Sequence, residues 1–180
     1  MSVRVRPPAP INSLPSFTAH GFDLNPMIDQ PPADPFSVES GRRSALQQAF
    51  LATEYVVNDD GREIVIRVGK ANAALRKLLA DRGVKRWAFI TACNPGAKMV
   101  PAHENDERLA RLRSELKAGG FRFIPGFGRG TTGDWPAEPS FLVLDIELNE
   151  AIGMARRFGQ LAIVTGELDG LPELVCCDKA

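Results

Sequence analysis

The sequence predicts an α+β domain, and the order of its apolar patterns is the main observation behind this prediction. Residues 87–92 form an apolar run rich in aromatic and branched side chains, which is typical of a buried strand. Helical and strand patterns follow in the order helix 103–118, strand 121–127, strand 140–146, helix 148–158 and strand 160–165. Strand, helix, strand, strand, helix, strand is the order of the split βαβ, or ferredoxin-like, arrangement. We therefore expect a ferredoxin-like sheet rich in antiparallel pairs.

Further elements are expected on both sides of this unit. A helix is predicted from Ser40 onward, because apolar side chains recur at three- and four-residue spacings at Ala45, Leu46, Ala49 and Phe50. Residues 53–57 and 63–68 flank a polar turn and predict a hairpin. Asn72 is a favourable cap for the helix that follows it, and residues 174–177 predict an edge strand.

The first 36 residues differ in composition from the rest of the chain. They hold eight of the 14 prolines and show no apolar periodicity. This composition predicts a disordered arm over 1–36, followed by a single α+β domain over 37–180. Codons for residues 3–10 can resemble the T-loop, acceptor strand and terminal CCA of a transfer RNA. We therefore expect translation to begin near Met27, and the alternative is a genuine proline-rich arm or a weak targeting peptide.

Composition and charge exclude several classes of function. Lys plus Arg and Asp plus Glu both number 22 in the 180 residues, so bulk charge predicts neither a nucleic-acid partner nor an anionic membrane. The longest apolar runs have the length of strands and are too short to span a bilayer. Three cysteines and two histidines predict a reduced, cytoplasmic setting, with no metal site and no identifiable cofactor.

One polar residue lies in an apolar stripe of the predicted helix 103–118. Asn105, Leu109, Leu112 and Leu116 follow one another at spacings of four, three and four residues. Asn105 therefore occupies a position that faces the core. We interpret it as a functional residue, and the alternative is that it caps the helix.

The predicted topology gathers polar residues at one end of the sheet. The end of strand 87–92, the start of helix 103–118, the start of strand 140–146 and the exit of the second helix all fall at that end. A glycine-dense connection, 126–133, is expected there as a mobile flap. The candidate ligand-binding residues are Thr91, Asn94, Glu104, Asn105, Arg108, Gly126, Gly128, Ser140 and Gln160.

The chemistry of these residues suggests a small-molecule site and leaves catalysis open. Arg108 and the helix N-terminus would suit a small anionic or nucleotide-like ligand. Glu104 and Glu138 are the candidates for proton transfer if the site is catalytic. Cys93 is interpreted as an inert buried thiol. The alternative function is a non-catalytic ligand-sensing or protein-interaction module, and a homodimer is an open alternative because such sheets often pair with one another.

Five separated motifs occur in order along the chain: residues 87–95, Glu104-Asn105 with Arg108 and Leu112, residues 126–128, residues 135–141 and residues 157–160. Together they resemble the bacterial family known as domain of unknown function 3293, over about residues 55–175. The family has no established activity, so the resemblance implies a domain identity without a mechanism. In the family pattern a bulky aromatic residue precedes the Asn-Pro step, and Cys93 departs from it, which further weakens a nucleophilic role for this thiol.

Overall fold

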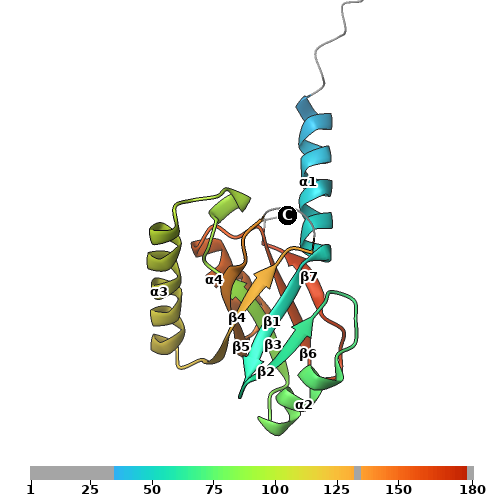
Figure 1. Ribbon diagram of the computed structural model, residues 1–180, viewed down its shortest axis with the longest axis vertical. Helices are drawn as coiled ribbons and strands as arrows, with labels where there is room; N and C mark the ends of the chain where they lie inside the picture. The colour runs from blue at the N-terminus through green and yellow to red at the C-terminus, as the bar shows by residue number, and fades with distance from the viewer. Residues whose placement is uncertain (1–34, 132–134, 178–180) are drawn as a thin grey trace, which may run out of the picture.

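The structure is a computed structural model, which describes residues 35–131 and 135–177, with only the backbone at 35–40, 42 and 43 (Figure 1). The helices are α1 (Pro35–Ala52), α2 (Ala73–Asp81), η1 (Pro95–Ala97), α3 (Ala102–Ala118) and α4 (Leu148–Arg157). The strands are β1 (Glu54–Asp59), β2 (Arg62–Ile66), β3 (Arg86–Thr91), β4 (Arg122–Arg129), β5 (Glu138–Leu144), β6 (Ala162–Glu167) and β7 (Glu173–Cys176).

The described strands form one antiparallel sheet in the order β2-β1-β4-β5-β3-β6-β7. The predicted α+β class is therefore confirmed. β3 is an inner strand of the sheet and pairs with β5 so that Thr91 is opposite Ser140. β5 pairs on its other side with β4, where Glu138 is opposite Gly128. These registers bring residues from three separate segments to one end of the sheet.

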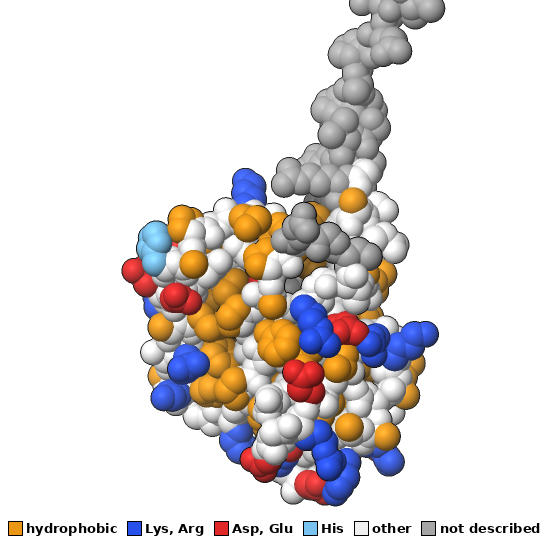
Figure 2. Space-filling view, in the orientation of Figure 1, with side chains coloured by type: hydrophobic (Ala, Val, Ile, Leu, Met, Phe, Trp, Pro, Cys, Tyr) orange, Lys and Arg blue, Asp and Glu red, His pale blue; other side chains and the backbone are white. Residues whose placement is uncertain are grey.

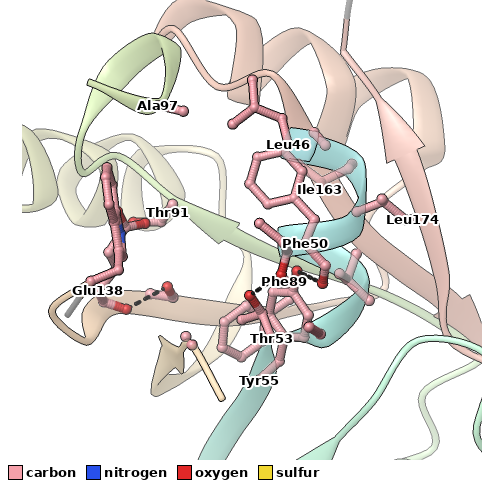
Figure 3. A pocket seen from close by; sticks show the side chains of 18 of the residues that line it. Leu46, Phe50, Thr53, Tyr55, Phe89, Thr91, Ala97, Glu138, Ile163 and Leu174 are labelled. Atoms are coloured by element: carbon pink, nitrogen blue, oxygen red, sulfur yellow. Dashed lines mark hydrogen bonds between the residues drawn. The ribbon is translucent and has the colours of Figure 1, made fainter. Parts of the chain in front are cut away.

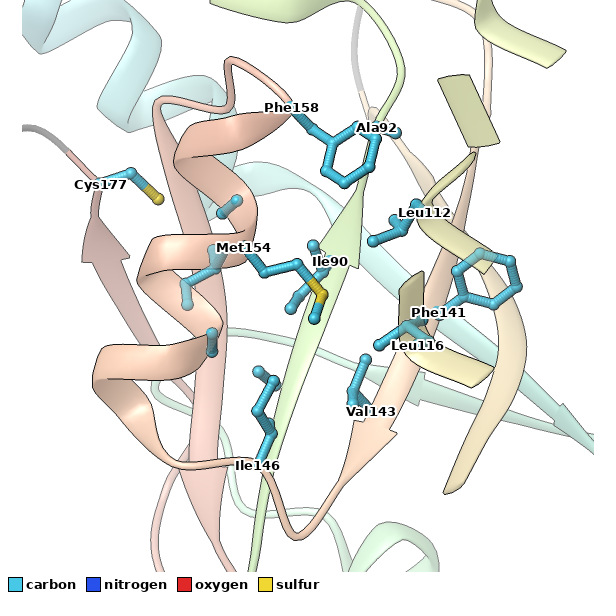
Figure 4. Packing of buried hydrophobic residues seen from close by; sticks show 14 residues of the cluster. Ile90, Ala92, Leu112, Leu116, Phe141, Val143, Ile146, Met154, Phe158 and Cys177 are labelled. Atoms are coloured by element: carbon cyan, nitrogen blue, oxygen red, sulfur yellow. The ribbon is translucent and has the colours of Figure 1, made fainter. Parts of the chain in front are cut away.

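Helices α3 and α4 cover one face of the sheet. Alternation along β3 directs Ala88 and Ile90 to this face, where they pack against Leu112 and Leu116 of α3 and Met154 of α4 (Figure 4). All of these side chains are buried. Burying one leucine contributes on the order of 1.5–3 kcal/mol, so this cluster is a main source of stability.

The opposite face is covered by α2 at one end only. Asn72 caps α2 by accepting the backbone N–H of Leu75 at 2.9 Å, as predicted. Leu75, Leu78 and Leu79 then pack with Trp87 and Phe89 of β3, which point away from α3 and α4. The rest of this face, beyond Phe89, lies under the end of α1.

Helix α1 projects away from the end of the sheet, and only its last turns approach the rest of the domain (Figure 1). Two hydroxyl groups hold this end. Thr53 Oγ1 donates to the carbonyl of Ala49 at 2.8 Å, and the Tyr55 hydroxyl donates to the carbonyl of Phe50 at 3.0 Å. The α1 backbone is thereby joined to the start of β1.

Three sequence predictions need correction or lie outside this structure. Residues 35 and 36, predicted to belong to the arm, begin α1, which starts earlier than Ser40. The remainder of the predicted arm and the start near Met27 lie outside the described residues. Gly126 and Gly128 are strand residues of β4 that pair with β1 and β5, so this part of the predicted flap is wrong.

Gly126 is required for a close approach of two strands. A Cβ atom at this position would lie 2.4 Å from the carbonyl oxygen of Val56 and 3.1 Å from the ring of Phe89. Side chains do not tolerate such a contact with backbone, so only glycine fits here. The glycine at position 126 thus reflects the packing of the sheet.

Charges on the surface are mixed. On the face seen in Figure 2, basic and acidic side chains are interspersed, in keeping with the equal totals of 22 each. Within the described residues, no helix is both long enough and apolar enough to cross a bilayer.

Candidate functional site

The loop after β3 has an unusual backbone that must be held in place. Asn94 and Ala97 adopt left-handed conformations with φ of 48° and 54°. Such angles are tolerated by asparagine and are rare for alanine. The Gly96 N–H donates to the carbonyl of Gly159 at 2.8 Å, which joins the loop to the end of α4. This loop contains the turn Asn94-Pro95-Gly96, which follows the end of β3.

A pair of amides joins the loop to α3. Asn105 Oδ1 accepts the backbone N–H of Asn94 at 2.8 Å, and Asn105 Nδ2 donates to Asn94 Oδ1 at 3.0 Å. Asn94 Oδ1 also accepts the N–H of Val100 at 3.1 Å. The cap of α3 is Pro101, with no side-chain hydrogen bond, so the alternative that Asn105 caps the helix is wrong. Its core-facing position is explained by its bonds to the loop.

Arg108 and Gln160 bind backbone carbonyls of the same region. Arg108 Nε donates to the carbonyl of Ala92 at 2.8 Å, and its Nη2 donates to that of Phe158. Gln160 Nε2 donates to the carbonyl of Cys93 at 2.8 Å. The predicted convergence of Asn94, Asn105 and Gln160 is therefore present in the geometry. We call Asn94, Asn105, Arg108 and Gln160 the loop-holding network, since the two asparagines bind one another and all four side chains bind backbone groups of residues 92–100.

Glu138 connects this network to the other face of the sheet. Its Oε1 accepts from Asn94 Nδ2 at 2.6 Å and from Trp135 Nε1 at 2.8 Å. Thr91 and Ser140 lie beside it and point to the face under α1. Thr91 Oγ1 donates to the carbonyl of Pro139 at 2.8 Å, and Ser140 Oγ donates to that of Glu138 at 2.9 Å.

A cavity of about 220 Å³ lies between the end of α1 and this face of the sheet (Figure 3). Its walls are mostly apolar. Helix α1 supplies Leu46, Ala49 and Phe50, and the sheet supplies Tyr55, Phe89, Val164 and Leu174. Its polar edge is formed by Thr91, Glu138 and Ser140, with Ala97 and Trp135 at the rim.

The cavity separates the predicted site residues into two groups. Thr91, Gly128, Ser140 and the candidate acid Glu138 line it. The other predicted residues are absent from its lining, namely Asn94, Glu104, Asn105, Arg108, Gly126 and Gln160. Glu104 is partly exposed beside Arg108, with Oε1 and Nη1 4.0 Å apart. The predicted direction of Arg108, toward a ligand, is wrong, since its guanidinium faces the loop carbonyls.

The aromatic and α1 residues of the cavity were missed by sequence reasoning. Phe50 and Tyr55 belong to segments that the sequence pattern assigned to an added helix and hairpin. Trp135 and Glu138 lie in residues 135–141, which form one of the family motifs. Only the pairing of β1 with β4 places Tyr55 opposite Gly128, and hence beside Glu138.

Burial governs the titration of two groups here. Burial raises the pKa of the Tyr55 phenol well above its usual value, and the charge of Glu138 adds to this rise. Burial also raises the pKa of the Cys93 thiol, whose Sγ contacts the carbonyl of Pro139. A nucleophilic cysteine needs a lowered pKa, so Cys93 has the character of a packing residue. Among the described residues, no group of three or more His, Cys, Asp or Glu side chains is placed to hold a metal ion.

The fold and the cavity define an antiparallel α+β domain with a pocket between an appended helix and one sheet face. Residues 90–163 match the family model described as protein of unknown function (DUF3293). The resemblance to this family is thus confirmed. The matched segment runs from β3 to β6 and contains the loop-holding network and Glu138. Comparisons with curated proteins and with solved structures gave no match.

Proposed function

We propose that this chain is a small-molecule-binding domain whose ligand occupies the cavity between α1 and the sheet. The observation that carries the proposal is the cavity itself, which has apolar walls and one polar edge formed by Thr91, Glu138 and Ser140. A concave, mainly apolar space with a few converging polar groups is the usual form of a ligand site. Ferredoxin-like topology for the central strands is part of the same proposal, supported by the antiparallel order β4-β5-β3-β6.

In this proposal the loop-holding network supports the site without contacting the ligand. Asn105 holds Asn94, and Asn94 in turn holds Glu138 through its Nδ2. The same loop places Ala97 at the rim. A carboxylate fixed by two donors on one oxygen keeps a defined orientation toward the cavity, which is what a binding group requires.

The cavity favours a ligand smaller than a nucleotide. Its volume of about 220 Å³ lies below the roughly 300–1,000 Å³ of typical ligand pockets. The expectation of an anionic ligand depends on Arg108 and the start of α3, and neither lines the cavity. The proposed ligand is therefore a small molecule, and an anionic group is not part of the proposal. Glu104 also lies outside the lining, so a Glu104–Glu138 acid–base pair is not part of the proposal.

A neutral aromatic probe tests the proposal. Benzyl alcohol, with its eight heavy atoms, should bind the full chain with a Kd on the order of 1 mM. Amide chemical shifts should move at Thr91, Gly128 and Ser140, at the floor and polar edge of the cavity. Ala49→Phe should abolish these shifts by filling the space from α1.

Ala45→Phe is the matched control. Ala45 lies one turn earlier in α1, is exposed and is absent from the lining, so this substitution makes the same change in helix propensity and leaves the cavity open. Shifts that are absent, that map elsewhere, or that survive Ala49→Phe would contradict the proposal.

A further inference from the structure

The side chains that line the cavity have already used their hydrogen-bond donors. Within the described lining, six residues carry a donor: Thr53, Tyr55, Thr91, Thr131, Trp135 and Ser140. The five hydroxyl groups donate to the backbone carbonyls of Ala49, Phe50, Pro139, Ala52 and Glu138 respectively, at 2.8–3.0 Å. The indole of Trp135 donates to Glu138. A hydroxyl has a single proton, so these oxygens offer only lone pairs to a ligand.

The carboxylate of Glu138 adds a negatively charged hydrogen-bond acceptor, the oxygen Oε2. Glu138 is the only charged side chain in the described lining. Both of its hydrogen bonds end on Oε1, and no donor from the described part of the chain reaches Oε2. A ligand that brings a donor to Oε2 would form a charge-assisted hydrogen bond, which is about twice as strong as a neutral one.

Aromatic rings enclose the same space. Phe50, Tyr55, Phe89 and Trp135 all line the cavity, and Tyr55 and Phe89 pack edge to face with centroids 5.4 Å apart. Figure 3 shows Phe50, Tyr55 and Phe89 on the side of the cavity opposite Glu138. The faces of aromatic rings carry negative potential and attract cations, whereas they repel anions.

We propose that the cavity binds a small organic ammonium ion, a primary or secondary amine with an aromatic or branched alkyl group. The ammonium group donates to Glu138 Oε2, and the apolar group lies between Phe50 and Phe89. This proposal depends on the proposed function, because it specifies the ligand class of the same cavity. An anionic ligand would lie against a carboxylate, acceptor oxygens and aromatic faces. The described lining contains no cationic side chain that could offset this repulsion.

The test compares three benzyl compounds of nearly equal size at pH 7: benzylamine, benzyl alcohol and benzoate. Titrations of the full chain by NMR give the three dissociation constants. Benzylamine should bind roughly tenfold or more tightly than benzyl alcohol, the ratio expected for gaining one charge-assisted hydrogen bond. Benzoate should bind more weakly than either.

Glu138→Gln should reduce the preference for benzylamine to near unity. The amide oxygen of glutamine can still accept from Asn94 and Trp135, so the fold is expected to persist, and its thermal transition checks this. Glu150→Gln is the matched control, because it removes one negative charge from an exposed site in the first turn of α4. It should leave the preference unchanged.

The outcomes separate this proposal from the one on which it depends. If no benzyl compound binds, both fail. If benzyl alcohol and benzylamine bind equally, the small-molecule site stands and the ammonium proposal is overturned, as it is if Glu138→Gln keeps the preference. A readout independent of variants is the nuclear Overhauser effect from the benzylamine methylene. It should reach the Glu138 side chain in the wild-type chain, and contacts of this methylene with Phe89 alone would overturn the orientation.

Discussion

The amide pair between Asn105 and Asn94 makes a strong prediction about stability. Asn105→Ala removes the acceptor of the Asn94 N–H and the donor to Asn94 Oδ1. Asn94 is buried, with 5% of its surface exposed, so water does not readily replace the lost partner. Its Oδ1 keeps the N–H of Val100, and its backbone N–H becomes unpaired.

The expected loss follows from these two bonds. An unpaired buried donor costs about 1–3 kcal/mol, and the second lost bond costs about 0.5–1.5 kcal/mol. Alanine recovers roughly 0.6 kcal/mol through its higher helix propensity. We therefore expect Asn105→Ala to lower the free energy of unfolding by about 1–4 kcal/mol. The thermal midpoint should fall by roughly 2–16 °C for a chain of this size.

Urea denaturation of the wild-type and variant chains measures this loss. Asn149→Ala is the matched control, because Asn149 is exposed in the first turn of α4. It should not lower the free energy of unfolding, and any rise should not exceed the helix-propensity gain of roughly 0.6 kcal/mol. If Asn105→Ala were equally mild, the amide pair would not support the loop, and the hypothesis of Asn105 as a functional residue would regain its basis.

Two further predictions concern the sheet. Gly126→Ala should strongly destabilise the fold, because its Cβ would lie 2.4 Å from the carbonyl of β1, while Gly128→Ala should be tolerated, since its nearest contact is 3.6 Å. Equal thermal midpoints for the two variants would contradict the close approach of β4 to β1. The hydrogen bond from Arg129, together with Arg67, holds the pKa of Glu54 below the ordinary 4.5. A lowered pKa stabilises the fold above pH 4.5, and this contribution is lost as the pH falls through the folded-state pKa. The difference in urea midpoint between wild type and Glu54→Gln should therefore shrink from pH 7 to pH 3, and a constant difference would show that Glu54 does not titrate in this way.

Local patterns predicted the elements well, because each element obeys short-range rules. The apolar run 87–92, the stripe of α3 and the cap Asn72 have the positions expected from residue spacing alone. Helix α1 starts five residues earlier than the pattern predicts, since the stretch before Ser40 lacks a clear apolar stripe. The pattern predicts a flap that includes Gly126 and Gly128, because a glycine in a strand cannot be told from a glycine in a loop without knowing what approaches it.

The candidate site was predicted in part. Element order places Asn94, Asn105, Ser140 and Gln160 at one end of the sheet, and the hydrogen bonds there agree. Chain order does not specify which groups bind each other and which face a cavity. Arg108 shows the difference, since a cation beside a helix start suggests an anion site, whereas its guanidinium is occupied by the carbonyls of Ala92 and Phe158.

The sequence by itself determined the α+β class, the positions of the helices and strands, and the family resemblance, because periodicity, caps and motifs are properties of neighbouring residues. Only the tertiary structure decided where a cavity lies and which side chains line it. The cavity exists because β1 pairs with β4 and α1 ends over the sheet, which joins Phe50, Tyr55 and Phe89 to Glu138. Those contacts join residues that are far apart in the chain. The side chains that line the cavity donate their protons to other groups of the protein, so the cavity presents acceptors.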